Sequence, residues 1–575
     1  MLGNRAVARG LYEAGCRFVS AYPGTPSTEI TEEAAKYPEI YAEWAPNEKT
    51  ALEAAIGASL AGARSFCAMK HVGLNVAADP LYTAAYTGVN GGLVIAVADD
   101  PGMHSSQNEQ DSRHHAIASK IPMLEPSDSA ECKEFSAKAF ELSEEYDTPI
   151  IFRTCTRVAH SQSSVSLSER IEPPLLEYHK DNAKYSMSPA NAIKRHVFVE
   201  ERMARLAKAA EDCKFNRIEL RSTEIGFITS GSSYLYVRET FPDASVLKLG
   251  LVNPLPTELF RKFAASVKKL YVIEELDPII ETHVRALGIP LDGGKNLTGL
   301  CGELSQRRLA QALGKPVPQM CTFNAPVPGR PPVLCPGCPH RGLFYTLSKL
   351  KLTVVGDIGC YTLGGMAPLN AVDTTVCMGA SIGMLHGFTK IRPDQSGKTV
   401  AVIGDSTFMH SGMTGIAELV YNRGFGTVLI LDNAITGMTG HQQNPTTGLT
   451  LQEEPTYAIR MEDVCRALGV NRVRIVDPAA LIQLEAAIKE ELAADEPSVI
   501  IVRRPCALLK GVKRNPPVKV DPTLCRGCKM CMRLGCPAIR FENGAASIDD
   551  TLCVGCGLCT QMCHFDAIKG NGGEQ

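Results

Sequence analysis

The sequence predicts a multidomain α/β protein with two doubly wound units, a smaller α/β domain between them and a cysteine-rich C-terminal domain. Three observations support this prediction. The chain has 575 residues, of which 45% are hydrophobic, enough for several buried cores. Short apolar runs alternate with helical stretches over most of its length, as parallel sheets flanked by helices require. The last fifty or so residues carry eight cysteines in two matched runs.

Composition and charge exclude several classes of function. The net charge is −3 and no long basic run occurs, which argues against nucleic acid as a partner and favours small molecules and proteins. The first ten residues lack the apolar core of a signal peptide, and the apolar run Leu93–Ala98 is too short to span a bilayer. The other cysteines are scattered, as in a reducing compartment. We therefore expect a cytoplasmic protein without a membrane partner, from an anaerobic host.

The first doubly wound unit is predicted over residues 1–165. A predicted strand is followed by a rigid turn, Tyr22-Pro23-Gly24-Thr25-Pro-Ser27. Ligands bind at such positions in open α/β sheets. The alternative is an ordinary turn without a binding role. Glu48 opens a helix rich in Ala and Gly. On its own, a carboxylate at that position indicates a capping or dipole role.

A dense polar loop, Ser105–Arg113, follows the buried strand Leu93–Ala98 in the same unit. Its hydrogen-bonding side chains include Gln107, Asn108 and Arg113. A position beyond the carboxyl end of a strand favours a ligand-facing loop. A solvated surface loop is the alternative.

The middle of the chain divides into a helical linker over residues 166–220, a smaller α/β domain over 221–320 and a second doubly wound unit over 325–512. The smaller domain has no evident catalytic residues, so a supporting role is expected. The third segment opens with Cys335-Pro-Gly-Cys338-Pro-His340, which could be a metal site, a redox pair or a stiff turn. Its Gly-rich turns expose backbone N–H groups to phosphate; they include Gly359, Cys360, Gly379, Ala380 and Ser381.

Two polar side chains follow neighbouring strands of this unit. Asp405 lies in Gly404-Asp405-Ser406 after one apolar strand, and Asn433 follows the strand Thr427–Leu431, with a helix predicted between them at about 412–422. Oxygen ligands at one sheet edge, together with phosphate oxygens, are what Mg²⁺ prefers.

The cysteine-rich domain, residues 515–575, is typical of a ferredoxin with two clusters. In the bacterial pattern, each run of three thiolates takes its fourth ligand from the other run. This predicts one cluster on Cys525, Cys528, Cys531 and Cys563, and a second on Cys553, Cys556, Cys559 and Cys536. Zinc or disulfides would not explain the C-x-x-C-x-x-C triplets. Two departures are visible: four residues rather than three precede Cys536, and His564 replaces a common proline.

The Asp405 to Asn433 arrangement resembles the thiamine pyrophosphate motif, Gly-Asp-Gly followed by Asn-Asn, with Ser406 and Asp432 as departures. The order of the units then resembles the alpha subunits of indolepyruvate:ferredoxin oxidoreductases, within the 2-oxoacid:ferredoxin oxidoreductase family. The motifs that carry this resemblance are Tyr22–Ser27, Asn47-Glu48, Met69–Asn75, Ser105–Arg113, Cys335–His340 and Gly404–Ser406.

The resemblance implies thiamine pyrophosphate, Mg²⁺ and two [4Fe-4S] clusters as cofactors. Glu48 would be the catalytic carboxylate against the aminopyrimidine ring, and Mg²⁺ would be held by Asp405, Asn433 and the backbone carbonyl of Ile435. Lys70, Gln107, Asn108 and Arg113 are candidates for binding substrate or coenzyme A. The other expected cofactor contacts are Tyr22, Pro23, Gly24, Thr25, His71, Cys338, His340, Gly359, Cys360, Gly379, Ala380, Ser381, Gly404 and Ser406. His71 could instead be a core histidine.

The resemblance also implies an activity: oxidative decarboxylation of an arylpyruvate with coenzyme A, with electrons passing through the two clusters to an external ferredoxin. Members of the family pair this chain with a smaller beta subunit, so an α₂β₂ complex is expected. A non-oxidative thiamine decarboxylase is one alternative, which the cysteine runs argue against because that reaction releases no electrons. An electron-transfer or scaffold subunit is another, which the presence of Glu48, Asp405 and Asn433 argues against.

Overall fold

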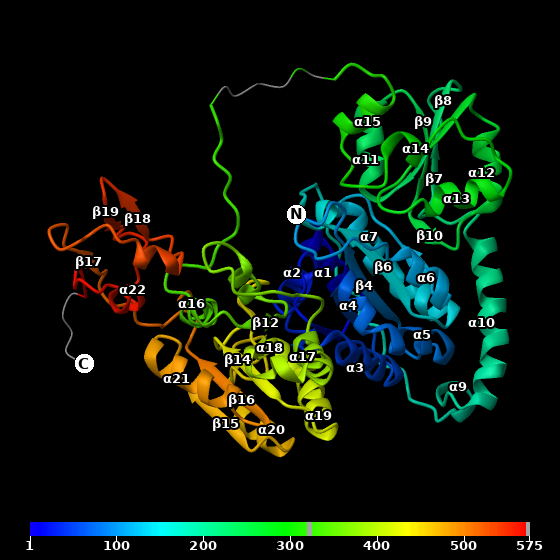
Figure 1. Cartoon of the computed structure of the whole chain (residues 1–575). Helices are drawn as coiled ribbons and strands as arrows, with labels where there is room; N and C mark the ends of the chain where they lie inside the picture. The colour runs from blue at the N-terminus through cyan, green and yellow to red at the C-terminus, as the bar shows by residue number, and fades with distance from the viewer. Residues whose placement is uncertain (318, 320–324, 571–575) are drawn as a thin grey trace. The chain divides into compact units, whose positions relative to one another are not determined.

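The computed structural model describes residues 1–317, 319 and 325–570. The predicted end of the smaller α/β domain at residue 320 and that of the cysteine-rich domain at residue 575 lie outside the described residues. The chain divides into two compact units, Met1–Asn324 and Ala325–Gln575 (Figure 1). Within the described residues, no helix is both long and apolar enough to cross a membrane.

The first unit is organised around a seven-stranded sheet with the order β10-β5-β6-β4-β3-β1-β2. All neighbours are parallel except β10, which runs antiparallel to β5. The strands are β1 (Phe18–Ala21), β2 (Tyr41–Trp44), β3 (Ser65–Lys70), β4 (Leu93–Asp99), β5 (Met123–Leu124), β6 (Ile150–Cys155) and β10 (Leu251–Asn253). Every residue of β4 is buried, as expected for a central strand covered on both faces.

Helices cover both faces of this sheet. They are α1 (Gly3–Glu13), α2 (Thr28–Ala34), α3 (Glu48–Leu60), α4 (His71–Val76), α5 (Ala78–Thr87), α6 (Arg113–Ser119), α7 (Ser129–Tyr146) and α8 (Thr156–His160). Helix α3 begins where predicted, because the Asn47 side chain accepts a hydrogen bond from the Thr50 amide at 2.8 Å and caps the helix.

A four-stranded sheet with the order β11-β8-β9-β7 forms the rest of the first unit. Three strands are parallel and β7 is antiparallel to β9. The strands are β7 (Arg217–Glu219), β8 (Ile225–Ser230), β9 (Ser245–Leu249) and β11 (Lys269–Ile273). The helices are α11 (Gly231–Thr240), α12 (Thr257–Ala264), α13 (Ile279–Ala286), α14 (Lys295–Thr298) and α15 (Gln306–Ala312).

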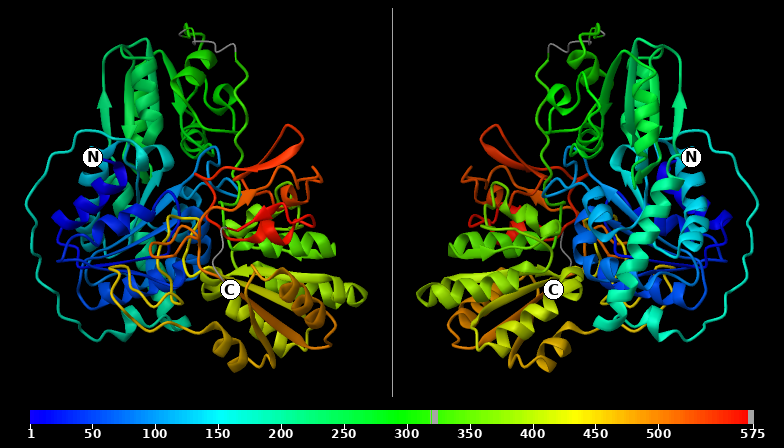
Figure 2. Two further views of the ribbon diagram at one scale, coloured as in Figure 1. Left: turned by 90° about the vertical axis from the view of Figure 1, so that its left-hand side faces the viewer. Right: turned by 90° about the vertical axis from the view of Figure 1, so that its right-hand side faces the viewer.

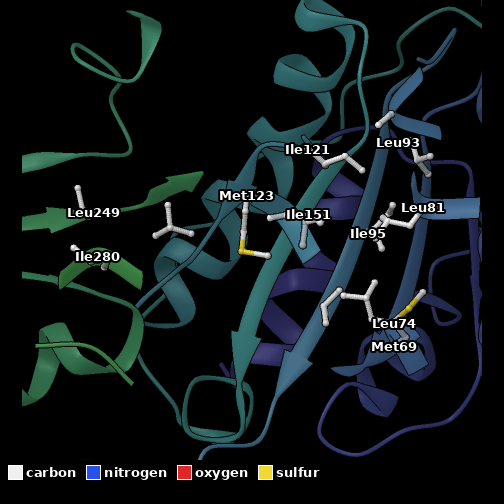
Figure 3. Close-up of a cluster of buried hydrophobic side chains, with 14 of the residues drawn as sticks. Met69, Leu74, Leu81, Leu93, Ile95, Ile121, Met123, Ile151, Leu249 and Ile280 are labelled. Carbon is white, nitrogen blue, oxygen red and sulfur yellow. The ribbon is translucent and has the colours of Figure 1, made fainter. Parts of the chain in front are cut away.

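The two sheets of the first unit share one hydrophobic core. Side chains of the seven-stranded sheet, such as Ile95 and Ile151, belong to the same buried cluster as Leu249 and Ile280 from the smaller sheet and its helix α13 (Figure 3). The strand β10 extends the larger sheet although its residues fall within the segment predicted as the separate domain. The two regions therefore bury apolar surface together.

The segment 166–220 is only partly helical. Residues 163–181 form neither helix nor strand and run in an extended path outside the larger sheet (Figure 2). Backbone hydrogen bonds from Ile171 to Glu13 at 3.0 Å and from Leu176 to Gly62 at 3.2 Å hold this path. Helices α9 (Asn182–Tyr185) and α10 (Pro189–Ala209) follow, and β7 then pairs with the smaller sheet. The prediction of a helical linker over residues 166–220 was therefore wrong for the extended path and for β7.

The second unit contains a five-stranded parallel sheet with the order β12-β13-β14-β16-β15. Its strands are β12 (Thr353–Val355), β13 (Thr399–Gly404), β14 (Gly426–Asp432), β15 (Arg472–Val476) and β16 (Pro497–Arg503). The helices are α16 (His340–Leu350), α17 (Ala380–Ile391), α18 (Asp405–Thr407), α19 (Met413–Tyr421), α20 (Met461–Ala467) and α21 (Leu481–Leu492). Between α18 and α19 the chain forms a π-helical turn, Phe408–Gly412, a feature frequent near functional sites.

The cysteine-rich segment consists of two short antiparallel ribbons and two helical turns. The ribbons pair β17 (Lys519–Val520) with β20 (Ile568–Lys569), and β18 (Ile539–Glu542) with β19 (Ala545–Ile548). The turns are Met530–Leu534 and α22 (Leu558–Gln561). This segment shares a hydrophobic core with α16 and α21. The buried Arg341 of α16 also donates to the carbonyl oxygen of Leu534 at 2.6 Å.

A buried ion network ties the Ser105–Arg113 loop to the smaller sheet. The Arg113 guanidinium pairs with Asp111 and with Glu274, each at 2.6 Å, and all three side chains are at most 1% exposed. It also donates to the backbone carbonyls of Glu275 and Asp277. Without this arginine Glu274 would lose its ion-pair partner, and Asp111 would keep only the longer contact with Arg153, at 3.6 Å.

We expect Arg113→Met to destabilise the first unit by about 3–5 kcal/mol, since removing one partner of a buried ion pair leaves an uncompensated charge. The measurement is the thermal and urea unfolding of the variant. Lys138→Met is the control, because Lys138 and its partner Glu141 are each more than half exposed and such pairs contribute only about 0–1 kcal/mol. Equal effects of the two substitutions would contradict the proposed role of the network.

Candidate functional site

Three oxygen atoms converge at the carboxyl edge of the five-stranded sheet. Asp405 follows β13, Asn433 follows β14, and these strands are neighbours in parallel register. The Asn433 side-chain oxygen faces the Ile435 carbonyl oxygen, at 2.7 Å, and the Asp405 carboxylate, at 3.3 Å. The structure thus brings together the three residues that the sequence predicts as magnesium ligands.

The Asn433 amide can face its neighbours in either of two ways. Turned one way, its nitrogen donates to the Ile435 carbonyl and to the Asp405 carboxylate. Turned the other way, its oxygen joins them as a third acceptor, which is the arrangement that a bound cation would favour. A magnesium ion prefers carboxylate, amide and carbonyl oxygens of this kind. The donor set therefore fits Mg²⁺.

Electrostatics support the same interpretation. Burial, together with the nearby Asp432 carboxylate, raises the pKa of Asp405 to about 8. A bound cation would favour the ionised form of such a carboxylate. Asp432, one of the two departures from the thiamine motif, turns its own carboxylate to Arg503, at 2.6 Å. Ser406, the other departure, accepts a hydrogen bond from Thr436 at 3.0 Å.

A buried carboxylate that the sequence analysis missed organises the glycine-rich turns. Asp357 accepts hydrogen bonds from the amides of Ile358, Gly379 and Ser381 at 2.8, 2.8 and 3.0 Å. Gly379 has φ +83° and an added Cβ would lie 1.9 Å from the Ser411 hydroxyl oxygen. The turn that precedes Ala380 and α17 therefore needs glycine.

Two further glycines of the predicted cofactor contacts pack against one aromatic ring. Added Cβ atoms at Gly359 and Gly404 would lie 2.4 and 2.6 Å from the Tyr361 ring. The Tyr361 hydroxyl donates to the Ile358 carbonyl at 2.8 Å. The ring of His340, at the start of α16, meets Tyr361 edge-on at 6.0 Å between centroids, and burial lowers the pKa of His340 to about 4, so this imidazole is neutral at neutral pH.

In the first unit, Glu48 lies at the start of α3 and is 4% exposed. Its carboxylate packs directly against α4: an added Cβ at Gly73 would lie 2.6 Å from both Cγ and Oε1 of Glu48. Only glycine at residue 73 leaves room for the carboxylate in this position. Gly73 is thus a positioning residue that sequence patterns did not identify.

The predicted Tyr22–Thr25 turn lies beside Lys70. Tyr22 and Pro23 are buried, whereas Gly24 and Thr25 are partly exposed. An added Cβ at Gly24 would lie 3.1 Å from the Lys70 Cβ. The Lys70 ammonium donates to the Ser105 carbonyl at 2.7 Å, and burial lowers the pKa of Lys70. Lys70 therefore connects the turn at Gly24 with the beginning of the polar loop.

The remaining substrate candidates have different environments. Gln107 and Asn108 are exposed on the polar loop, whose start is fixed by the Asp100 carboxylate. Arg113 is the exception among the predictions, because its guanidinium is buried and fully engaged by the ion network described above, so its geometry supports a structural role. His71 is 1% exposed, and burial lowers its pKa, as for a neutral core histidine.

Four further thiols gather near the Asp405 oxygens: Cys335, Cys338, Cys360 and Cys506. Burial raises the pKa of Cys360 to about 11, with smaller contributions from the thiols of Cys506 and Cys335. Burial raises that of Cys338 to about 12, with contributions again from Cys360 and Cys335. The Cys506 amide donates to the Asn433 carbonyl at 2.9 Å. The sequence analysis did not identify Cys506, since 146 positions separate it from Cys360.

The eight C-terminal cysteines line two separate cavities. One is lined by Cys525, Cys528, Cys531 and Cys563, and the other by Cys536, Cys553, Cys556 and Cys559. These are the two crossed sets that the sequence predicts. In each set the thiols surround a space, and among the described residues no three Cys, His, Asp or Glu side chains converge as they would for a single metal ion. Four separated thiolates suit an iron–sulfur cluster.

Residues from outside the cysteine-rich segment also line the second cavity. Pro336, Gly337 and Arg341 line it together with the cysteines. Gly337 has φ +70°, and an added Cβ would lie 2.1 Å from the Val554 side chain. The loop between Cys335 and Cys338 therefore lies directly on the cluster segment.

The fold and these sites define a thiamine-pyrophosphate-dependent enzyme of the 2-oxoacid oxidoreductase class that carries its own iron–sulfur domain. Three family profiles match the chain: "Pyruvate flavodoxin/ferredoxin oxidoreductase, thiamine diP-bdg" at residues 9–221, "Thiamine pyrophosphate enzyme, C-terminal TPP binding domain" at 357–502, and "4Fe-4S dicluster domain" at 517–564. These matches confirm the predicted thiamine pyrophosphate and [4Fe-4S] clusters.

Full-length relatives identify the particular family. The chain is 40% identical to the indolepyruvate oxidoreductase subunit IorA of Archaeoglobus fulgidus, over 99% of this chain and 97% of that protein. It is also 40% identical to the subunit of that name from Thermococcus kodakarensis, over 99% and 96%. The protein belongs to the IorA family of indolepyruvate oxidoreductase subunits, which confirms the family predicted from the sequence.

Solved structures match more distantly. A 2-oxoglutarate:ferredoxin oxidoreductase from Magnetococcus marinus aligns with a TM-score of 0.46 and 21% identity, over 55% of this chain and 64% of that one.

We expect Gly73→Ala to lower kcat by about 10- to 100-fold with the fold retained, because the new methyl group displaces a proposed general acid–base group. The measurement is 2-oxoacid-dependent viologen reduction, alongside circular dichroism. Gly57→Ala on α3 is the matched control, since an added Cβ there meets nothing within 4 Å, and alanine favours a helix. Full activity of the Gly73 variant would contradict the positioning role.

We expect Cys563→Ser to disturb the cluster of the Cys525 set and to leave the other intact, although residue 563 is only four positions from Cys559. The crossed arrangement of thiols around the two cavities is the reason. Cys536→Ser is the reciprocal variant. Electron paramagnetic resonance of the reduced protein distinguishes the two clusters, and loss of the Cys553-set signal on Cys563→Ser would contradict the assignment.

Proposed function

We propose that this chain is the catalytic subunit of an enzyme that oxidatively decarboxylates arylpyruvates of the indolepyruvate type. Indolepyruvate, coenzyme A and two oxidised ferredoxins would give the arylacetyl thioester, CO₂, one proton and two reduced ferredoxins. The observation that carries this proposal is the convergence of Asp405, Asn433 and Ile435 oxygens in the same unit as two thiol-lined cavities. The second unit thus contains both the proposed ligands of the cofactor and the proposed ligands of the clusters.

The residues of each unit suit a different part of the cofactor. Asp405, Asn433 and the Ile435 carbonyl would hold Mg²⁺ on the diphosphate, and the amide-bearing turns fixed by Asp357 would bind its oxygens. When bound, thiamine pyrophosphate supplies an electron sink for the pair released as CO₂ leaves. Glu48 would hold and exchange a proton at the aminopyrimidine nitrogen. Its burial strengthens that interaction.

We further propose that Cys335, Cys338, Cys360 and Cys506 hold a third iron–sulfur cluster. Four thiols near one another are the number such a cluster needs. They lie near the proposed magnesium ligands, and the loop between Cys335 and Cys338 lines the cavity of the Cys553 set. The four cysteines, which we call the Cys335 group, would hold a cluster that supplies one-electron transfer, in the order Cys335 group, Cys553 set and Cys525 set. Iron analysis tests this step: about 12 iron atoms per chain support it, and about 8 contradict it.

Substrate and assembly follow from the relatives. Their name, indolepyruvate oxidoreductase subunit, supports an arylpyruvate substrate and at least one further subunit, which we propose to be the smaller beta subunit of an α₂β₂ complex. Lys70, Gln107 and Asn108 are our candidates for contacts with the substrate carboxylate or coenzyme A. A non-oxidative decarboxylase would not need the two cavities lined by cysteines, because it transfers no electrons to an acceptor. A scaffold would not need a catalytic carboxylate such as Glu48.

The experiment is an anaerobic assay of the purified complex with indolepyruvate, coenzyme A and oxidised viologen or ferredoxin. We expect acceptor reduction that depends on coenzyme A. Release of an aldehyde without acceptor reduction would indicate the non-oxidative decarboxylase. Absence of turnover after reconstitution with cofactors would indicate a scaffold.

Within that assay, Glu48→Gln should reduce the rate by roughly 10²- to 10⁴-fold, the usual contribution of a general acid–base group. Reduction of the clusters by dithionite should not change. Glu53→Gln is the matched control, because Glu53 lies on the same helix but is 47% exposed and pairs with the exposed Lys49. Full activity of Glu48→Gln would refute the role of this carboxylate.

A further inference from the structure

The two clusters of the C-terminal segment differ in their access to solvent. In the Cys525 set, Cys528 is exposed, and all lining residues of the cavity come from the segment itself. In the Cys553 set no thiol is exposed, and Pro336, Gly337 and Arg341 close one side. An external protein can therefore approach the Cys525 set more closely than the other set.

Cations surround the accessible set. Arg526 and Lys529 are exposed on either side of Cys528, and Lys529 lies over the Phe541 ring at 4.5 Å from its centroid. An added Cβ at Gly527 would lie 2.6 Å from the Gly544 carbonyl, so this loop is pressed against the β18–β19 turn. Its backbone is thus held in place, and the two charges project from a fixed position.

A second pair of cations lies beside the same cavity. Lys519 of β17 and Lys569 of β20 are directly paired across the antiparallel ribbon, and both are exposed. Like charges placed opposite one another destabilise a ribbon. Ile568, next to Lys569, lines the cavity, as does Phe565, which is 45% exposed. An unfavourable pair of like charges thus lies next to the apolar side chains that line the Cys525-set cavity.

The surrounding carboxylates offset this charge only in part. Hydrogen bonds from the Thr523 hydroxyl at 2.6 Å and amide at 2.9 Å, together with the charge of Lys569, lower the pKa of Asp521. Asp549 pairs with Arg540. Glu542, Asp550 and Asp566 are the other exposed acids of the segment. Residues 515–570 contain six Lys and Arg against five Asp and Glu, so the positive charge belongs to the positions around the Cys525 set and not to the segment as a whole.

We infer that electrons leave the enzyme through the Cys525 set, and that Arg526, Lys529, Lys519 and Lys569 form a docking surface for an acidic electron-carrier protein. We call these four side chains the basic rim. An acidic partner would relieve the repulsion between Lys519 and Lys569, and Phe565, which lines the same cavity as Arg526 and Lys529, would provide an apolar contact. Rim charges of this kind govern association rate and salt dependence. This inference rests on the proposed function, because it takes the carrier to be the final electron acceptor.

The test uses the intact complex and an acidic bacterial-type [4Fe-4S] ferredoxin. Arg526→Glu with Lys529→Glu should raise the KM for ferredoxin roughly 10-fold or more at low ionic strength. The difference should shrink as salt screens the charges, since the Debye length falls to about 3 Å at 1 M. Viologen reduction should not fall, because a small dication does not need the rim. Lys519→Gln with Lys569→Gln, on other elements, should show a smaller effect in the same direction.

The control is Arg392→Glu with Lys398→Glu, which makes the same change in charge at exposed positions before β13. It should leave the KM for ferredoxin unchanged. An unchanged KM in both rim variants, or an equal rise in the control, would overturn the docking surface. Direct binding of oxidised ferredoxin to the complex is measured in parallel. It needs no turnover, so weaker binding to the rim variants supports the surface even if the wild type does not oxidise indolepyruvate.

Discussion

The carboxyl ends of β13 and β14 bring a carboxylate, an amide side chain and a carbonyl oxygen to one point, and these are the donor groups that a magnesium ion prefers. Much of the second unit can be understood from this grouping. Parallel register sets Asp405 and Asn433 side by side, the neighbouring turns are fixed by Asp357, and Tyr361 packs against Gly359 and against Gly404 at the end of β13. Each contact restrains the position of a proposed magnesium ligand or of a turn beside it.

A close contact at Gly337 connects the part of the second unit that holds the proposed magnesium ligands to the cysteine-rich segment. Gly337 leaves no room for a side chain between the Cys335–Cys338 loop and Val554, and Arg341 on the following helix donates to Leu534. The shared core with α16 and α21 fixes the segment further. Electron transfer needs groups held at short, constant separations. The contacts around Gly337 and Arg341 provide that constancy within one compact unit.

The sequence was sufficient for features that depend on local pattern. The strand Thr427–Leu431 was predicted to within one residue of each end of β14, because apolar runs between turns define buried strands. The crossed thiol sets followed from spacing alone. Contacts between distant segments could not be predicted: Gly73 against Glu48, Asp357 against Gly379, and Cys506 beside Asn433 depend on how elements pack. The buried ion pair of Arg113 could not be predicted for the same reason, since its partner Glu274 lies 161 positions away.

The proposed chemistry is divided unevenly between the two units. Glu48, Gly73 and Lys70 belong to the first unit, whereas the magnesium ligands and all proposed cluster ligands belong to the second. A defect in the first unit should therefore stop the delivery of electrons from substrate while leaving the clusters reducible. A defect around Gly337 should impair electron flow even when carbon–carbon cleavage is intact. The two classes of defect can be distinguished because decarboxylation and acceptor reduction are measured separately. Each residue can then be assigned either to carbon–carbon cleavage or to electron transfer.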